Sequence, residues 1–340
     1  MPGVPGGASP PSASLPIRMT EAPLRVALVG GVPPTLGGGG LETQLEQTLA
    51  ALQRRGIEAF HAGREPVARP FDLLHAIGAE PDVCQWLAHW RRNPAPLVVS
   101  PVLVIPPGRE RLELAVGRVP LRSYGPHARA ALLRRSDLAV AQTRHEAGLL
   151  RRLGAREVTI VPNGVAPVPD APVPHGTPPA PYVVLLGTVN ARKRQAQTVA
   201  ALRGVTIVIA GGFEGTPQER ADFERAVAAA GATWLGEVAD PGAVRALLRG
   251  ARALVHLSSA EGQSLAVLEA LSEGTPVVVS PLPANRELRE RHPAHVAFAE
   301  DPEGVAAALA HLDVADRPAP AIPTWDDVAA ELEDAYRRIS

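Results

Sequence analysis

The chain has 340 residues, enough for two domains that each bury a core. With 46% hydrophobic and 20% charged residues it has an ordinary globular composition, and a formal net charge of -1 excludes the overall basic character of many nucleic-acid-binding proteins, so we expect no nucleic-acid partner. Its single cysteine, Cys84, excludes an internal disulfide and fits a reducing cytoplasm.

Residues 1–22 are rich in proline, glycine and serine and are predicted to form a disordered tail. They contain no apolar run behind a basic start, so they do not resemble a secretion signal. No stretch reaches the about 18 consecutive apolar residues that predict a membrane-spanning helix. We expect a cytoplasmic protein, with peripheral contact at the inner face of the membrane as the open alternative.

Two sets of short apolar runs alternate with helical segments along the chain. The first set covers residues 24–30, 71–78, 96–105, 136–143 and 157–164, and the second covers 182–187, 205–212, 251–258, 275–280 and 294–300. Most runs lack period-two alternation, as is typical of strands buried on both faces of a parallel sheet. The pattern predicts an α/β protein with two parallel-sheet lobes.

A proline-rich segment, residues 165–181, separates the two sets and is predicted to be a stiff, extended linker. It divides the chain into a first lobe, residues 23–164, and a second lobe, residues 182–322. A helix is expected over 323–340, and its return to the first lobe is a hypothesis. Two such lobes form a cleft at the carboxyl ends of their strands, where α/β folds bind ligands.

The first candidate loop, "GGVPPTLGGGG", follows the strand at 24–30 and leads into a predicted helix near Leu41. Gly38 and Gly39 would let the backbone approach a ligand closely, and the free N–H groups at the start of the helix would attract an anion. A merely flexible loop would have the same sequence, so both interpretations stay open.

The second candidate loop, "GTVNARKRQ", starts at Gly187 and contains Arg192, Lys193 and Arg194. Lys193 is the only lysine among 34 lysine and arginine residues. A compact ammonium group on a strand-to-helix loop is a suitable point charge for a phosphate. Three consecutive side chains cannot all point one way, so two are expected at a common anion; a solvated loop is the alternative.

The third candidate loop, "SSAEGQSLAVLEAL", contains Glu261 and Glu269 with seven residues between them. Ser264 is expected to cap a helix on which Leu265 and Glu269 lie one turn apart. A carboxylate inside this apolar segment is costly to bury without partners, and ligand hydroxyl groups would be suitable ones. The alternative is a surface glutamate on an amphipathic helix.

Together, these loops and the segment "TIVPNGV" before the linker resemble the retaining glycosyltransferases of the GT-B fold in family 4, the glycosyl transferases group 1. The resemblance covers about residues 24–300 and implies two Rossmann-like lobes facing across a cleft. It implies a nucleoside-diphosphate sugar as donor and an acceptor hydroxyl of unidentified origin.

The resemblance also implies a role for each matching residue. Arg192 and Lys193 would hold the donor diphosphate, Glu261 would approach the donor sugar, and Glu269 would bind the ribose hydroxyl groups. Backbone N–H groups of Gln263, Ser264 and Leu265 would face the diphosphate. The sequence has no Asp-x-Asp motif for a divalent cation, so we expect neither metal nor cofactor, with the leaving phosphate deprotonating the acceptor.

The chain departs from the family pattern at two places, one in the donor-phosphate loop and one on the acceptor side. Thr188 follows Gly187 where many members have arginine, and the segment 96–105 lacks the histidine that many members carry there. His75, at the end of an earlier predicted strand, is a weak candidate for acceptor binding, although a lone histidine there is more often structural.

The segment "VCQWLAHWRR" places Val83, Trp86, Leu87 and Trp90 on one helical face beside two arginines. A helix packed on its sheet is the favoured interpretation. Contact with anionic lipid, which would suit a lipid-linked acceptor, is the alternative.

Other classes of protein also have two such lobes. Nucleotide-sugar 2-epimerases would use the same donor, but the spacing of Glu261 and Glu269 disfavours them. A periplasmic binding protein is disfavoured by the lack of an export signal. A non-catalytic, nucleotide-binding pseudo-transferase differs from an enzyme only in activity and stays open.

Overall fold

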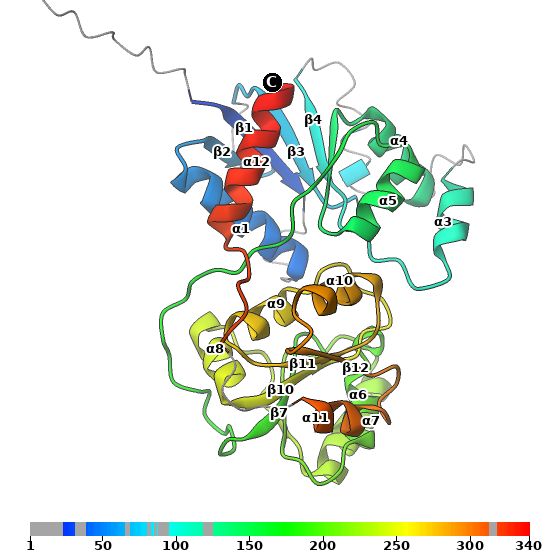
Figure 1. The fold of residues 1–340 in the computed structure, drawn as a ribbon, viewed down its shortest axis with the longest axis vertical. Helices are drawn as coiled ribbons and strands as arrows, with labels where there is room; N and C mark the ends of the chain where they lie inside the picture. Colours follow the sequence, from blue (N-terminus) through cyan, green and yellow to red (C-terminus); the bar gives the residue numbers. More distant parts are fainter. Residues whose placement is uncertain are drawn as a thin grey trace, which may run out of the picture.

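The computed structural model describes residues 23–30, 39–64, 69–79, 83–84, 87, 95–117, 125–312 and 318–340. In this part the chain forms two α/β lobes, one above the other in Figure 1. The predicted tail, Gly38, and the tryptophans Trp86 and Trp90 lie outside the described residues.

The first lobe contains a six-stranded parallel sheet in the order β2-β1-β3-β4-β5-β6. Its strands are β1 (Arg25–Gly30), β2 (Glu58–His61), β3 (Leu73–Ile77), β4 (Leu97–Ser100), β5 (Leu138–Ala141) and β6 (Val158–Ile160). Its helices include α1 (Gly40–Arg54), α3 (Glu110–Val116), α4 (Gly125–Arg135) and α5 (Arg144–Leu153).

The second lobe repeats this architecture with a parallel sheet in the order β12-β11-β10-β7-β8-β9. Its strands are β7 (Tyr182–Leu186), β8 (Ile207–Ala210), β9 (Thr233–Trp234), β10 (Ala251–His256), β11 (Val277–Val279) and β12 (Val296–Phe298). Its helices are η2 (Ala191–Lys193), α6 (Gln195–Ala201), α7 (Pro217–Ala230), α8 (Pro241–Gly250), α9 (Leu265–Ser272), α10 (Pro283–Arg291) and α11 (Val305–His311). The predicted α/β class with two parallel sheets is confirmed.

The observed strands differ from the predicted ones mainly at strand ends and sheet edges. The run 96–105 forms a strand only as far as Ser100, because Pro101 has no N–H for the ladder and Val102 adopts a φ of 51°. Two edge strands were missed. β2 is half polar, and β9 has only two residues.

The last helix, α12 (Trp325–Ile339), packs on the first lobe rather than the second. It lies beside α1, as the red helix in Figure 1, and buries Trp325 and Tyr336 in the core under β1 and β3. Before the helix, Thr324 pairs with Val165 of the linker in an isolated parallel bridge. The chain therefore crosses between the lobes at two adjacent points.

No helix among the described residues is long and apolar enough to cross a membrane.

Candidate active site

A cleft of about 750 Å³ lies between the lobes at the carboxyl ends of their central strands. The first lobe lines it with Gly39, Gly40, Leu41, Thr43, Gln44, Val102, Val104, Gln142 and Asn163. The second lobe contributes the predicted residues Gly187, Arg192, Lys193, Glu261, Gln263, Ser264, Leu265 and Glu269. The cleft has the volume of a typical ligand site, and it brings together residues far apart in the sequence.

The loop after β7 folds into one turn of 3-10 helix, η2, that directs Lys193 toward the strand end. Asn190 caps this turn, since its Oδ1 accepts the Lys193 N–H at 3.1 Å. Gln195 Nε2 donates to the carbonyl oxygens of Gly187 and Thr188 at 3.2 and 3.0 Å and closes the loop. Gly187 has a φ of 104°, which favours glycine, and a Cβ there would push Nζ of Lys193 away from its position.

Arg192 connects this loop to the loop after β10. Its guanidinium forms an ion pair with Glu261 and donates to the Ala260 carbonyl at 2.9 Å. Its own carbonyl accepts the Ser259 N–H at 2.8 Å. Backbone and side chain together therefore fix the positions of Arg192 and Glu261 relative to each other.

His256, at the end of β10, is a second partner of Glu261 that the sequence analysis missed. Its side chain is buried, with Nε2 at 3.7 Å from Glu261 Oε1 and 3.3 Å from Ser258 Oγ. Burial of Glu261 opposes ionisation, but His256, Arg192 and Lys193 outweigh burial and lower the pKa of Glu261 to about 2. Glu261 is thus a carboxylate throughout the physiological pH range.

The ammonium group of Lys193 is held in a largely desolvated position. Burial lowers its pKa below the ordinary lysine value, and the nearby Glu261 carboxylate partly opposes that shift. A cation held this close to the cleft has lost most of its hydration, so it would gain most from an incoming anion.

Glu269 lies on α9 with its side chain lining the cleft. No described residue donates a hydrogen bond to its carboxylate, and burial raises its pKa, with Arg245 opposing the shift. Arg245, also missed from the sequence, is buried on α8 and donates to the Glu269 carbonyl at 3.2 Å and to Ser272 Oγ at 2.5 Å. Arg245 therefore fixes the helix while leaving the Glu269 carboxylate free for a ligand.

The backbone N–H groups of Gln263, Ser264 and Leu265, predicted to face the diphosphate, are not equally available to a ligand. The Gln263 N–H already donates to Gln142 Oε1 of the first lobe at 3.2 Å, so it does not face the cleft freely. Ser264 is the N-cap of α9, as expected, although its hydroxyl makes no capping hydrogen bond. Leu265 opens the helix beside it and lines the cleft, where N–H groups at a helix start favour an anion.

At the start of α1, the Gly39 N–H donates to Glu42 Oε2 at 2.8 Å. A carboxylate of the chain itself therefore occupies this N–H, next to the helix start that was predicted to attract a ligand anion. An anion could bind Gly39 only by displacing this contact.

His75 is not an acceptor residue, which corrects the prediction. It lies on β3 and is 1% exposed, with Nδ1 at 2.6 Å from Tyr336 Oη and Nε2 at 2.8 Å from Ser100 Oγ. Burial lowers its pKa to about 3, so the ring is neutral. The prediction that His75 ends a strand is also wrong, because His75 is the central residue of β3, and α12 covers the face to which it points.

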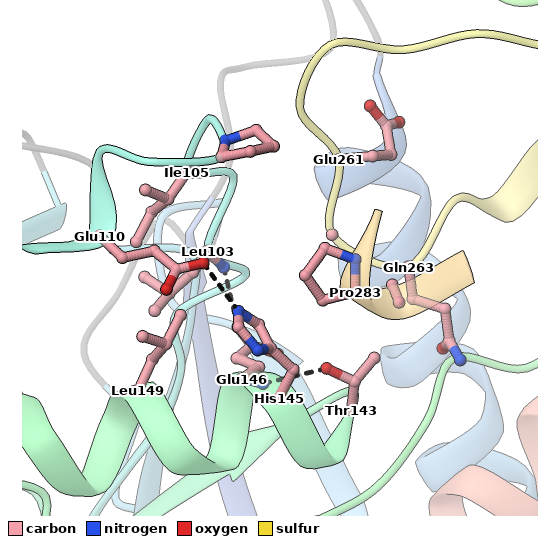
Figure 2. A pocket seen from close by; sticks show the side chains of 13 residues that line it. Leu103, Ile105, Glu110, Thr143, His145, Glu146, Leu149, Glu261, Gln263 and Pro283 are labelled. Carbon is pink, nitrogen blue, oxygen red and sulfur yellow. Dashed lines mark hydrogen bonds and ion pairs between the residues drawn. The ribbon is translucent and has the colours of Figure 1, made fainter. Parts of the chain in front are cut away.

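A smaller cavity of about 30 Å³ lies between α5 and the loop that carries Glu261. Figure 2 shows Glu261 and Gln263 pointing in different directions from this loop, opposite Leu103 and His145 of the first lobe. His145 Nε2 lies 3.1 Å from Glu110 Oε1, which holds the ring at the cavity wall. No group of three or more potential metal-ligating side chains occurs among the described residues.

The comparisons with known proteins concern the lobe that carries these charged residues and the fold of the chain. Residues 180–313, which contain every charged residue of the cleft named above, match the family model of the glycosyl transferases group 1. The second lobe is a group 1 glycosyltransferase domain. With it the chain is a glycosyltransferase enzyme, as the resemblance predicted. A search of the curated proteins finds no match.

Solved structures extend the similarity to the whole chain. Sucrose-phosphate synthase from Thermosynechococcus elongatus has a TM-score of 0.70 at 17% identity over 93% of this chain and 99% of that one. AviGT4, a glycosyltransferase involved in avilamycin A biosynthesis, has a TM-score of 0.62 at 20% identity over 93% and 98%. A UDP-forming α,α-trehalose-phosphate synthase from Burkholderia xenovorans has a TM-score of 0.64 at 12% identity over 92% and 100%. The glycosyltransferase therefore has the GT-B fold.

Proposed function

We propose that this enzyme transfers a sugar, with retention and without a metal ion, from a nucleoside-diphosphate sugar to an acceptor hydroxyl. The observation that supports the proposal is the convergence of Arg192, Lys193, Glu261 and Glu269 on one cleft. The adjacent cations Arg192 and Lys193 suit a diphosphate. The Glu269 carboxylate, which accepts no hydrogen bond from a described residue, suits the hydroxyl groups of a ribose.

Each residue has a distinct role in the proposed reaction. Lys193 and Arg192 stabilise the charge that develops on the leaving diphosphate, which is work that a divalent cation does in other transferases. Glu261 stays ionised at neutral pH and stabilises positive charge on the sugar ring as the glycosidic bond breaks. Because its pKa is about 2, Glu261 is not a proton donor.

The proposed transfer needs no protein nucleophile. The bond between the anomeric carbon and the diphosphate oxygen breaks, the acceptor oxygen attacks from the same face, and its proton passes to the departing diphosphate. This order of events conserves the anomeric configuration and places the proton on the leaving group, which needs it.

Calorimetry tests the donor site directly. The protein is titrated with UDP, GDP, ADP, TDP and their sugar conjugates, with and without EDTA, beside Lys193→Ala. We expect nucleotides of one base to bind at micromolar concentration regardless of EDTA. In a separate rate assay, Lys193→Ala should lower turnover by an amount that corresponds to a loss of about 2–4 kcal/mol of transition-state stabilisation. If EDTA abolishes binding or turnover, metal independence is wrong; if no nucleotide binds, the donor assignment is wrong.

A further inference from the structure

Four carboxamide side chains meet at the boundary between the lobes, in the wall of the cleft. Gln44 on α1, Gln142 after β5 and Asn163 after β6 belong to the first lobe, and all three are buried. Gln263 comes from the loop of the second lobe between Glu261 and α9. We call these four residues the interlobe amide cluster.

The first lobe holds Gln263 by three hydrogen bonds. Gln142 Oε1 accepts the Gln263 N–H at 3.2 Å, and Asn163 Nδ2 donates to the Gln263 carbonyl at 3.2 Å. The Asn163 N–H donates to Gln263 Oε1 at 2.6 Å. Backbone donor, backbone acceptor and side chain of one residue are therefore all bound by the opposite lobe.

The rest of the cluster fixes the orientation of Gln142. Its Nε2 donates to Gln44 Oε1 at 2.9 Å and to Asn163 Oδ1 at 3.2 Å. With both amide hydrogens used on the first lobe, the Gln142 oxygen must face Gln263. The cluster thus holds Gln142 Oε1 in the orientation in which it accepts from the second lobe, because buried networks of hydrogen-bonded side chains orient their members.

Gln263 lies in the turn that connects Glu261 to helix α9, both of which line the cleft. Gln263 is two residues from Glu261 and directly precedes Ser264, the N-cap of α9. Gly262 packs so closely that a Cβ there would lie 3.3 Å from Gln142 Oε1. The turn from Glu261 to Leu265 is therefore shaped by contacts from the first lobe.

We propose that Gln142 and Asn163 are positioning residues that hold the 261–265 turn in its binding geometry when the lobes are closed. The inference rests on the proposed function, since it assumes that this turn contacts the donor. Separation of the lobes breaks all three bonds to Gln263 and releases the turn. The contacts join neutral groups, so each is individually weak and the lobes can part to exchange substrates, whereas a buried ion pair would resist opening.

Gln142→Met tests the proposal, because methionine has similar volume and removes the three side-chain hydrogen bonds of Gln142. The matched control is Gln53→Met on the same lobe, which removes a carboxamide bond to the Ala59 carbonyl far from the cluster. Gln44→Met, which removes only the acceptor that orients Gln142, is a milder second variant if Gln142→Met yields no folded protein.

Spin labels on Arg156→Cys and Glu303→Cys, one on each lobe, report the interlobe distance by double electron–electron resonance. The measurement needs no substrate. We expect a narrow distribution in the parent and in Gln53→Met, and a longer, broader one in Gln142→Met. Turnover of the sugar nucleotide should fall about 10- to 100-fold in Gln142→Met, as for a small misplacement of a reacting group. Its Kd for the corresponding nucleoside diphosphate should rise by a smaller factor than turnover falls, since the 261–265 turn is released while Lys193 and Glu269, which lie outside it, keep their positions.

If Gln142→Met and Gln53→Met give the same distances and the same turnover, the proposal is overturned. A parallel loss of nucleotide affinity and stability, with unchanged distances, would indicate a merely structural cluster and would also overturn it. If the parent itself uses no sugar nucleotide, the proposed function fails, and the distance measurement alone decides whether the cluster holds the lobes together.

Discussion

At the scale of single residues, the desolvated ammonium group of Lys193 gives the enzyme a definite response to high pH. Its pKa lies below that of an ordinary lysine, and only the protonated form stabilises a leaving phosphate. As pH rises through this lowered pKa, the charge is lost, so kcat should decline at a lower pH than an ordinary lysine would allow.

Lys193→Arg checks this prediction in a profile of kcat against pH. A guanidinium stays charged throughout the range, so the alkaline decline should move to higher pH, even if the less compact group lowers kcat overall. An unchanged alkaline decline in Lys193→Arg would show that another group titrates.

Glu269 should show the opposite pH dependence, in nucleotide affinity. Its pKa is raised by burial, so the carboxylate is protonated and loses its acceptor capacity as pH falls through a value above that of ordinary glutamate. Glu269→Gln should weaken nucleotide binding at pH 7 and make the remaining affinity insensitive to mildly acid pH, as measured by calorimetry.

The same substitution should stabilise the unliganded enzyme. The fold disfavours the ionised form of Glu269, so this cost is present above the raised pKa and disappears when the residue is neutral. We expect Glu269→Gln to raise the free energy of unfolding at pH 7 by about 1 kcal/mol in denaturant titrations. Equal stability at pH 7 would mean that the carboxylate is already well solvated.

At the scale of elements, α12 depends on a buried polar chain as well as on its apolar face. Tyr336 of α12, His75 of β3 and Ser100 of β4 form a continuous line of hydrogen bonds. Tyr336→Phe keeps the packing but leaves His75 Nδ1 unpaired. We expect a loss of about 1–3 kcal/mol in the free energy of unfolding, with kcat and KM nearly unchanged. A large loss of kcat would reinstate His75 as a functional residue.

At the scale of the whole molecule, the two lobes also meet through α5 and α10. Glu287 of α10 accepts the N–H groups of Arg144 and His145 at 3.0 and 2.9 Å, at the start of α5. Arg144 adds ion pairs with Glu287 and Glu290, but its side chain is 59% exposed. Exposed ion pairs contribute little stability and are screened by salt, whereas the buried hydrogen bonds between neutral groups of the interlobe amide cluster are not screened by salt.

The closed arrangement should therefore be largely insensitive to ionic strength. Between low salt and about 1 M sodium chloride, where the screening length falls to about 3 Å, the interlobe distance distribution should change much less than it does in Gln142→Met. Opening of the lobes by salt alone would show that the α5–α10 ion pairs, and not the amide cluster, hold them.

The sequence by itself determined the fold class, the division into two lobes and which second-lobe loops line the cleft. Runs such as "YVVLLG" are apolar on both faces, as is typical of strands in a covered parallel sheet, and glycines and basic residues directly after them mark strand-end loops. Local patterns therefore placed Lys193 and Glu261 in strand-end loops, which converge on one edge of a sheet, and Glu269 in the first turns of the helix that follows.

Only the tertiary structure decided which neighbours these residues have. His256 and Arg245 lie in ordinary strand and helix segments, and no local pattern predicts that they contact Glu261 or hold α9. Asn163 stands in the quoted "TIVPNGV", yet its bonds to Gln263 join residues 100 positions apart across two lobes. His75 was misassigned for the same reason: which face of β3 is covered depends on where α12 packs, and helix packing between distant segments is a property of the assembled core.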